Sequence, residues 1–170
     1  MNGDARSTSL IGGLEYETVR PVIETLDSLS SDKSVKGIKL TLTSSGGWFH
    51  SAFTLFDYIK SYSKPVNIIA TGCCHSSAIL VLQAGAKRLS RPHTDFQFHR
   101  VVHEVAEATS EDIKTKLVGF KRQEEVYFDT VAKRTKLSSS QIKRLCSTER
   151  SFGPEEALDW GLIDEIEKPG

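Results

Sequence analysis

Ser76 lies in a stretch of the chain whose residue types suit a nucleophile. It follows residues 66–70 (VNIIA), an apolar run typical of a buried strand, and it precedes residues 78–85 (AILVLQAG), which are typical of an apolar helix. A serine at such a strand-to-helix turn can expose its Oγ while its backbone is held rigidly. The free N–H groups at the start of the helix would face the same point and could stabilise an oxyanion. Because serine is also a common helix N-cap, this turn alone does not distinguish a nucleophile from a cap.

A nucleophilic serine also needs a base, a group that orients the base, and backbone donors for the oxyanion. His99 ends residues 96–99 (FQFH), which alternate like a strand, so its ring could project over the end of a sheet. Residues 44–47 (SSGG) predict a turn in which the backbone can approach a ligand closely. Sequence spacing leaves the other histidines open as alternative bases: His50, His75, His93 and His103.

The overall composition excludes several classes of function. Lys and Arg number 22, and Asp and Glu also number 22. The chain therefore has no excess of positive charge that would indicate binding to nucleic acid or to an anionic membrane. No segment is long enough to span a membrane, and residues 1–6 lack the apolar stretch of a signal peptide. We therefore expect a cytoplasmic protein. The three cysteines, Cys73, Cys74 and Cys146, have no zinc-like spacing, so we expect reduced core residues, no metal and no cofactor.

Strands alternating with helices predict an α/β fold with a parallel sheet in one domain, residues 1–170, whose residues 1–8 are flexible. We expect Gly85 to end its helix with a positive φ. The helices are predicted at 15–29, 51–62, 78–85, 110–134, 138–146 and 154–160. The strands are predicted at 35–43, 66–70, 87–90, 96–99 and 162–166, with a short first strand or turn at 9–13.

The long helix at 110–134 has an apolar stripe that indicates either a core helix or a surface for another subunit. The stripe consists of Ile113, Leu117, Phe120, Tyr127 and Val131.

Four motifs in order resemble the proteolytic subunit of the ATP-dependent Clp protease. They are residues 43–47 (TSSGG), 72–78 (GCCHSSA), 84–87 (AGAK) and 156–164 (EALDWGLID). The resemblance covers nearly everything from residue 35 to residue 166. It implies a serine endopeptidase with the ClpP/crotonase-like fold: repeated β-β-α units, a mainly parallel sheet and a long protruding handle helix. It also implies that peptides or unfolded chains are cleaved inside a homo-oligomeric chamber of stacked heptameric rings.

The same resemblance assigns roles to individual residues. Ser76 falls on the nucleophile and His99 on the base. The N–H groups of Gly47 and Ser77 fall on the oxyanion hole. Counting back from residues 156–157 and forward from 141–142 puts Glu149 at the position of the family's aspartate, and Asp95 is the competing acid.

The sequence departs from the family at two functional regions. Residues 99–103 (HRVVH) replace the family's His-Gln-Pro and glycines, so peptide binding is expected to differ. The chain before residue 35 is short, so we expect little of the loops with which the family engages its AAA+ unfoldase. Two alternatives therefore stay open: a ring subunit that has lost catalysis, and acyl-coenzyme A chemistry on the related crotonase fold, which shares the paired N–H oxyanion hole without the Ser/His pair.

Overall fold

The computed structural model describes residues 5–102 and 109–168, which form an α/β fold around a mainly parallel sheet. The strands follow the order β1-β2-β3-β4-β7, and β5 pairs with both β3 and β6. Every pairing is parallel except that of β5 with β6. The strands are β1 (Ala5–Ile11), β2 (Gly37–Ser44), β3 (Val66–His75), β4 (Arg88–Ser90), β5 (Asp95–Gln97), β6 (Ser151–Phe152) and β7 (Glu165–Ile166).

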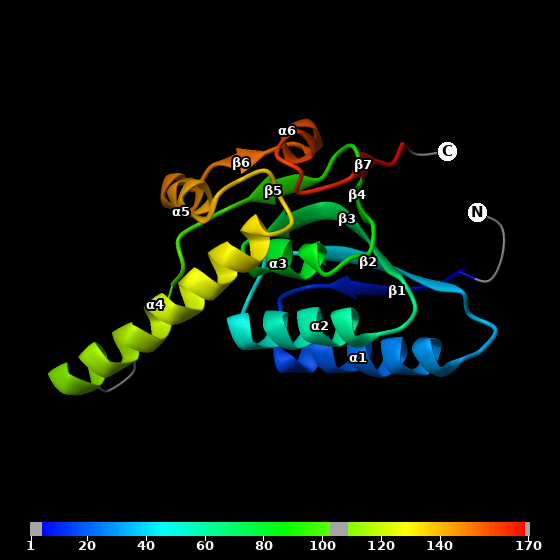
Figure 1. The fold of residues 1–170 in the computed structure, drawn as a ribbon, viewed down its shortest axis with the longest axis horizontal. Coiled ribbons are helices and arrows are strands. Elements are labelled where there is room, and N and C mark those ends of the chain that lie inside the picture. Colours follow the sequence, from blue (N-terminus) through cyan, green and yellow to red (C-terminus); the bar gives the residue numbers. More distant parts are fainter. Residues whose placement is uncertain (1–4, 103–108, 169–170) are drawn as a thin grey trace.

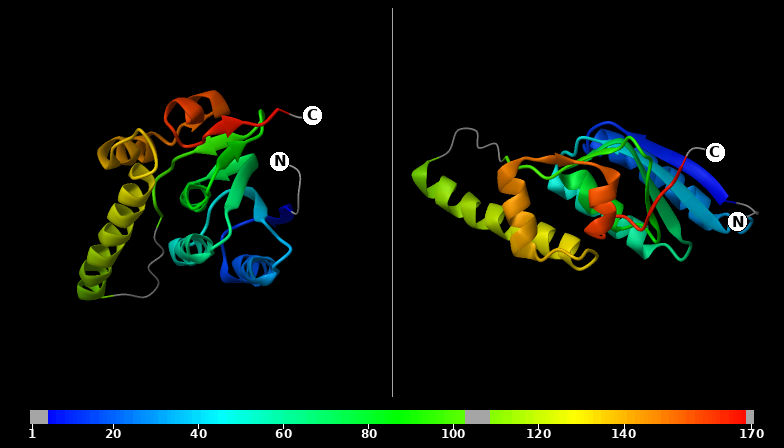
Figure 2. Two further views of the ribbon diagram at one scale, coloured as in Figure 1. Left: turned by 45° about the vertical axis from the view of Figure 1, so that its right-hand side comes forward. Right: turned by 90° about the horizontal axis from the view of Figure 1, so that it is seen from above.

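The helices surround this sheet in two groups. The first three pack in a row, α1 against α2 and α2 against α3, along one face of the strands (Figures 1 and 2). The second group begins with the long α4, which contacts α3 and α5. The helices are α1 (Tyr16–Ser31), α2 (Phe49–Ser61), α3 (Ser77–Gln83), α4 (Ser110–Ala132), α5 (Ser139–Thr148) and α6 (Pro154–Asp159).

The hydrophobic pattern explains how the sheet is buried. In β2, the residues with even numbers from Ile38 to Ser44 are buried, whereas the alternate residues are partly exposed, as expected when one face of a strand packs on helices. α3 is buried along its whole length because it lies between the sheet, α2 and α4. The sequence therefore correctly predicted an α/β fold with a mainly parallel sheet.

β3 has two different neighbours along its length, and this arrangement creates the site. Its residues Ile68–Ala70 pair with β4, whereas its residues Cys73–His75 pair with β5. At the same end of the sheet, Ser44 of β2 is in register with Cys74 of β3. Because the strands are parallel, the segments that leave β2, β3 and β5 emerge at the same edge.

The structure differs from the sequence expectations in several local features. β5 covers Asp95–Gln97, so His99 follows this strand and does not end it. Residues 5–8 were expected to be flexible but belong to β1, which pairs with β2 from Ala5 to Ile11. β3 continues to His75, whereas the expected strand ended at residue 70. Gly85 does not have a positive φ. It is close-packed instead, because an added Cβ would lie 3.0 Å from the Lys87 carbonyl oxygen and 3.1 Å from Ile68 Cγ1.

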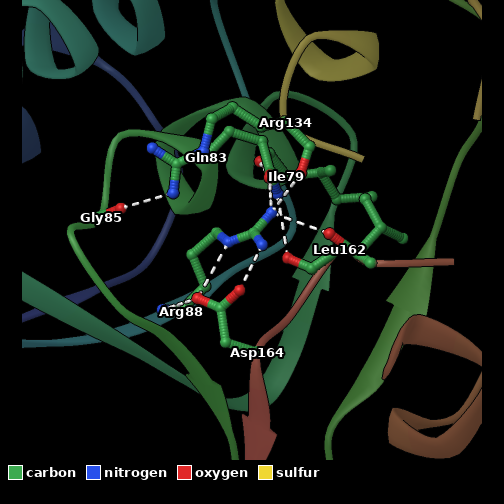
Figure 3. Close-up of polar contacts among 8 residues, drawn as sticks. Ile79, Gln83, Gly85, Arg88, Arg134, Leu162 and Asp164 are labelled. Carbon is green, nitrogen blue, oxygen red and sulfur yellow. Dashed lines mark hydrogen bonds and ion pairs between the residues drawn. The ribbon is translucent and has the colours of Figure 1, made fainter. Parts of the chain in front are cut away.

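A buried polar cluster around Arg88 holds the carboxyl end of α3 (Figure 3). The Arg88 guanidinium forms an ion pair with Asp164. Its Nη1 donates to Gln83 Oε1 at 2.7 Å and to the carbonyl oxygens of Arg134 at 2.6 Å and Gly161 at 2.8 Å. Gln83 Nε2 in turn donates to the carbonyl oxygen of Leu162 at 3.2 Å. We call these residues the Arg88 cluster. It joins α3, the end of α4 and the segment before β7.

α4 starts at a capping box, in which the Thr109 hydroxyl accepts from Asp112 N–H at 3.2 Å. The helix then runs from an end that projects away from the sheet to an end beside α3 (Figures 1 and 2). The apolar stripe of α4 therefore has a buried part and an exposed part. Tyr127 and Val131, near the end beside α3, are buried, whereas Ile113 and Leu117, near the projecting end, are exposed. No helix within residues 5–102 and 109–168 combines the length and the apolar character needed to cross a lipid bilayer.

Candidate functional site

Ser76, His99 and Gly47 line one open cavity of about 690 Å³. Each residue follows one of the strands that end at the same edge: β3 ends directly before Ser76, β5 ends two residues before His99, and β2 ends three residues before Gly47. The structure therefore brings together three residues that the sequence assigned to one site. The cavity is also lined by His50, which the sequence left open as an alternative base, and by Trp48 and Glu15, which the sequence did not single out.

Ser76 has an uncommon backbone conformation, with φ 53° and ψ −127°. Its N–H donates to the Gln97 carbonyl oxygen at 2.8 Å, and its own carbonyl accepts from Ile79 N–H at 3.0 Å and from the Tyr127 hydroxyl at 3.1 Å. A non-glycine residue in such a region is strained by about 1–3 kcal/mol and persists only where its surroundings hold it. Strain of this kind is concentrated at functional sites, and it is typical of a nucleophile at a strand-to-helix turn.

The turn of residues 44–47, called the glycine turn below, fits against Ser76 because Gly46 has no side chain. A Cβ on Gly46 would lie 2.7 Å from Ser76 Cβ, and Gly46 has φ +96°. The turn is also tied to the segment before α1, since Leu14 N–H donates to the Gly46 carbonyl at 2.8 Å and Trp48 N–H donates to the Leu14 carbonyl at 3.0 Å. Glycine at position 46 therefore permits the close approach of the turn to the serine.

A side-chain hydrogen bond connects the two residues predicted to supply oxyanion donors. The Ser77 hydroxyl donates to the Gly47 carbonyl oxygen at 3.0 Å. Ser77 is the first residue of α3, where main-chain N–H groups have no acceptor within the helix. The bond fixes the glycine turn relative to the start of α3, which is the arrangement that a pair of preorganised N–H donors requires.

His99 has a main-chain oxygen within hydrogen-bond distance of one ring nitrogen. Its Nδ1 lies 2.7 Å from the main-chain carbonyl oxygen of Arg100. A carbonyl oxygen can only accept, so Nδ1 carries the proton and donates it. In the neutral ring, Nε2 is then the unprotonated nitrogen, which is the state that a general base needs.

Glu149 lies beside the residue that follows His99. Its carboxylate Oε1 is 3.4 Å from Arg100 Nε, in an exposed ion pair, and its main-chain carbonyl accepts from Gln97 Nε2 at 3.1 Å. Glu149 caps α5 in the left-handed region. Within the described part of the chain, Ser76 and Glu149 are the two non-glycine residues with a positive φ, 53° and 52°. The role of Glu149 as the acid stays a prediction, because His99 Nδ1 here bonds to Arg100.

The competing acid and two of the alternative histidines, His75 and His50, have other partners. Asp95 Oδ2 lies 2.7 Å from His75 Nε2 and accepts from the Ser151 hydroxyl at 3.2 Å, so Asp95 is paired with His75. His50 lines the cavity and lies 3.0 Å from Gln123 Nε2. His103 lies outside the described residues. In this structure the competing acid, Asp95, is therefore bound to His75 and not to His99.

Two aromatic side chains at the site were not predicted as functional. Trp48 is 61% exposed at the cavity and packs edge-on against Tyr16, with ring centroids 6.0 Å apart. Tyr127, which the sequence placed in an apolar stripe, uses its hydroxyl to bond Ser76. The sequence signal for Trp48 was its position directly after the glycine turn. For Tyr127, it was the one hydroxyl in an otherwise apolar stripe.

The described residues contain no group of three or more His, Cys, Asp or Glu side chains arranged to hold a metal ion. Burial raises the pKa of the Cys74 thiol, and burial raises the pKa of Cys146 to about 12. Both side chains therefore stay protonated at neutral pH and act as small core residues.

One comparison with known proteins bears on this site. The family model described as Clp protease matches residues 4–169, which is nearly the whole chain. The match includes every residue of the cavity named above.

Proposed function

The chain belongs to the Clp protease family, and we propose that it is a serine endopeptidase that cleaves peptides or unfolded chains. Ser76 is the nucleophile and His99 is the general base. The N–H groups of Gly47 and Ser77 form the oxyanion hole. The observation that carries the proposal is the single cavity lined by Ser76, His99 and Gly47, with Ser76 held in a strained turn.

In the proposed reaction, His99 Nε2 takes the proton from Ser76 Oγ as the oxygen attacks the carbonyl carbon of the peptide bond. The negative charge of the tetrahedral intermediate is stabilised by the two N–H groups. The intermediate collapses when His99 returns the proton to the leaving amine, which leaves an acyl group on Ser76. Water, deprotonated by His99, then releases the acyl group and restores the serine.

We also propose Glu149 as the acid that orients His99. Its main-chain bond to Gln97 holds it beside β5, the strand that leads to His99. Its carboxylate already pairs with Arg100, the neighbour of His99. A move of this exposed side chain from the guanidinium to Nδ1–H of His99 completes the triad. An exposed ion pair of this kind contributes about 0–1 kcal/mol, so its loss opposes the move little. The move also exchanges the Arg100 carbonyl oxygen for the carboxylate as the acceptor of His99 Nδ1–H.

Members of the family generally form oligomeric rings, and we propose a homo-oligomeric chamber for this chain. The projecting part of α4 supports this, because Ile113, Leu117 and Val118 are exposed there. Sedimentation velocity at micromolar concentration should detect a large assembly. A monomer that cleaves peptides at full rate would contradict the chamber but not the serine mechanism. The AAA+ unfoldase stays an open partner, and an ATPase-free peptide assay tests the peptidase without it.

Labelling with a fluorophosphonate followed by peptide mass spectrometry tests the central claim. We expect one labelled residue, Ser76, because only an activated serine reacts. Ser45 lines the same cavity and provides the matched control: the Ser45→Ala variant should still be labelled, and the Ser76→Ala variant should not. Labelling at Ser77 or Ser44, or no labelling at all, would refute the assignment.

A non-catalytic ring subunit is the second candidate. The specific observation in its favour is that His99 Nδ1 bonds to a main-chain carbonyl while the Glu149 carboxylate pairs with Arg100. A chain of this kind would assemble but would fail to react with the fluorophosphonate. The same experiment therefore distinguishes the two candidates.

A further inference from the structure

Tyr127 places a hydroxyl group in the apolar core next to Ser76. The side chain is 2% exposed, and its ring packs against Phe49 and Phe128 with centroids 5.3 Å and 5.6 Å away. The hydroxyl donates to the Ser76 carbonyl oxygen at 3.1 Å. Burying a phenol without a partner is costly, so this acceptor determines where the hydroxyl lies. Burial also raises the pKa of Tyr127 well above its usual value, which keeps the hydroxyl protonated and able to donate.

The acceptor of this bond belongs to a functionally important peptide group. The Ser76 carbonyl and the Ser77 N–H are parts of one planar peptide unit, and the described chain contains no cis peptide bond. In a trans unit, the N–H points opposite to the carbonyl oxygen. A donor that fixes the Ser76 oxygen therefore also fixes the direction of the Ser77 N–H, which is one of the two proposed oxyanion donors.

The backbone of Ser76 needs this support because it is strained. Its N–H is held from β5 by Gln97, and its carbonyl is held locally by Ile79 N–H. Tyr127 adds a contact from α4, across 51 positions of sequence. With its ring fixed by two aromatic neighbours, Tyr127 resists rotation of the peptide plane in a way that a bond within α3 alone does not.

We propose that Tyr127 is a positioning residue that holds the peptide plane between Ser76 and Ser77, so that α4 sets the orientation of both the nucleophile and one oxyanion donor. This inference rests on the serine endopeptidase function proposed above. The oxyanion forms only during the reaction. Loss of the hydroxyl should therefore slow the chemical step and leave substrate binding unchanged.

The test compares three variants in a peptide hydrolysis assay, in fluorophosphonate labelling and in thermal unfolding. Tyr127→Phe removes only the hydroxyl, and we expect a roughly ten-fold lower kcat, an unchanged KM and a similarly slower labelling of Ser76. Tyr62→Phe is the matched control. The Tyr62 hydroxyl donates to Asp27 Oδ1 at a distance of 2.7 Å, and Tyr62 does not line the cavity that contains Ser76. This control should keep wild-type kcat and the wild-type rate of Ser76 labelling.

A third variant separates the hydroxyl from the packing of the ring. Tyr127→Leu loses both, so it should melt at a lower temperature but match Tyr127→Phe in kcat when assayed well below its melting point. If Tyr127→Phe keeps wild-type kcat and labelling rate while wild-type Ser76 is labelled, the positioning role is overturned and the endopeptidase function stands. If the wild-type protein is neither active nor labelled, the endopeptidase function fails, and the inference fails with it.

Discussion

The two ends of α3 carry polar groups that are organised in opposite ways. At its carboxyl end, the Arg88 side chain is 8% exposed and its guanidinium contacts one carboxylate, one amide oxygen and two carbonyl oxygens (Figure 3). At its amino end, Ser76 opens onto a cavity of about 690 Å³ and is held through its main chain. Polar groups are thus satisfied by one another at one end and exposed for a substrate at the other.

The difference separates structural from functional polar groups. A buried cation must be paired and fully hydrogen-bonded, and Arg88 also lies at the end of α3 where a positive charge is favourable. Ser76 shows the reverse, since strain is kept in its backbone and its side chain faces an open space. We therefore expect changes at Ser76 to remove activity without loss of stability, and changes at Arg88 to remove stability without loss of the chemical step.

Ser76→Ala should have the largest effect on activity. Removing the nucleophile of a catalytic triad lowers kcat by about six orders of magnitude in a comparable enzyme. Stability should stay close to that of the wild type, because the main-chain bonds of residue 76 do not depend on the side chain. Peptide hydrolysis and chemical denaturation measure the two quantities. A substantial loss of stability in this variant would break the comparison.

Glu149→Gln should have the next largest effect. Replacing the acid of a triad with its amide costs about four orders of magnitude in kcat, because the amide no longer stabilises the charged imidazole. KM should change far less. The matched control is Asp95→Asn, since Asp95 is bound to His75. If Asp95→Asn lowers kcat more than Glu149→Gln does, the assignment of the acid is wrong.

Arg88→Leu should act on stability alone. The variant leaves Gln83 Oε1 and the carbonyl of Gly161 without their cationic donor, and losing a hydrogen bond to a charged group costs about 1.5–3 kcal/mol in the free energy of unfolding. Urea denaturation measures this loss. Fluorophosphonate labelling of Ser76 in the folded fraction should keep its wild-type rate. A slower rate in that fraction would mean that the two ends of α3 are coupled.

The smallest expected effect concerns acidic pH. Burial alone would raise the pKa of Asp164, but the hydrogen bonds and charge of Arg88 outweigh it and lower the pKa. A carboxyl group with a depressed folded-state pKa stabilises the protein above its unfolded pKa of about 4, and this contribution is lost as the pH falls through the folded-state value. The difference in stability between wild type and Asp164→Asn should therefore be constant near neutral pH and shrink below about pH 4. A difference independent of pH would contradict the charge effect of Arg88.

The sequence predicted the parts of this molecule that depend on local pattern and on parallel order. The apolar run before Ser76 and the alternation before His99 were sufficient to predict strands, and parallel strands carry the residues that follow them to one edge. Counting residues from neighbouring motifs was sufficient to select Glu149 as the candidate acid. Its ion pair with Arg100 was not predictable, because it depends on the conformations of two exposed side chains. Helical spacing assigned Tyr127 to an apolar face, and spacing does not reveal which atom its hydroxyl meets.

Short or close-packed features were the least predictable. β6 has two residues and no periodicity of its own, and it forms because Phe152 stacks on Phe96 across the antiparallel pair, with centroids 5.7 Å apart. Gly85 matched a common helix-ending pattern, yet the space around its Cα required glycine for another reason. Both outcomes depend on contacts between segments that are distant in the sequence.

The contacts of Arg88 also bear on how the chain acquires its structure during synthesis. Its acceptors at Arg134, Gly161 and Asp164 follow it by 46, 73 and 76 positions. Contacts of such long range form late, because a large loop must close before they are gained. We expect a nascent chain that ends before residue 161 to have β1, β2 and β3 available for pairing while the guanidinium of Arg88 still lacks its carboxylate. Protease digestion of ribosome-bound chains should show protection around β4 only after Asp164 has left the ribosome.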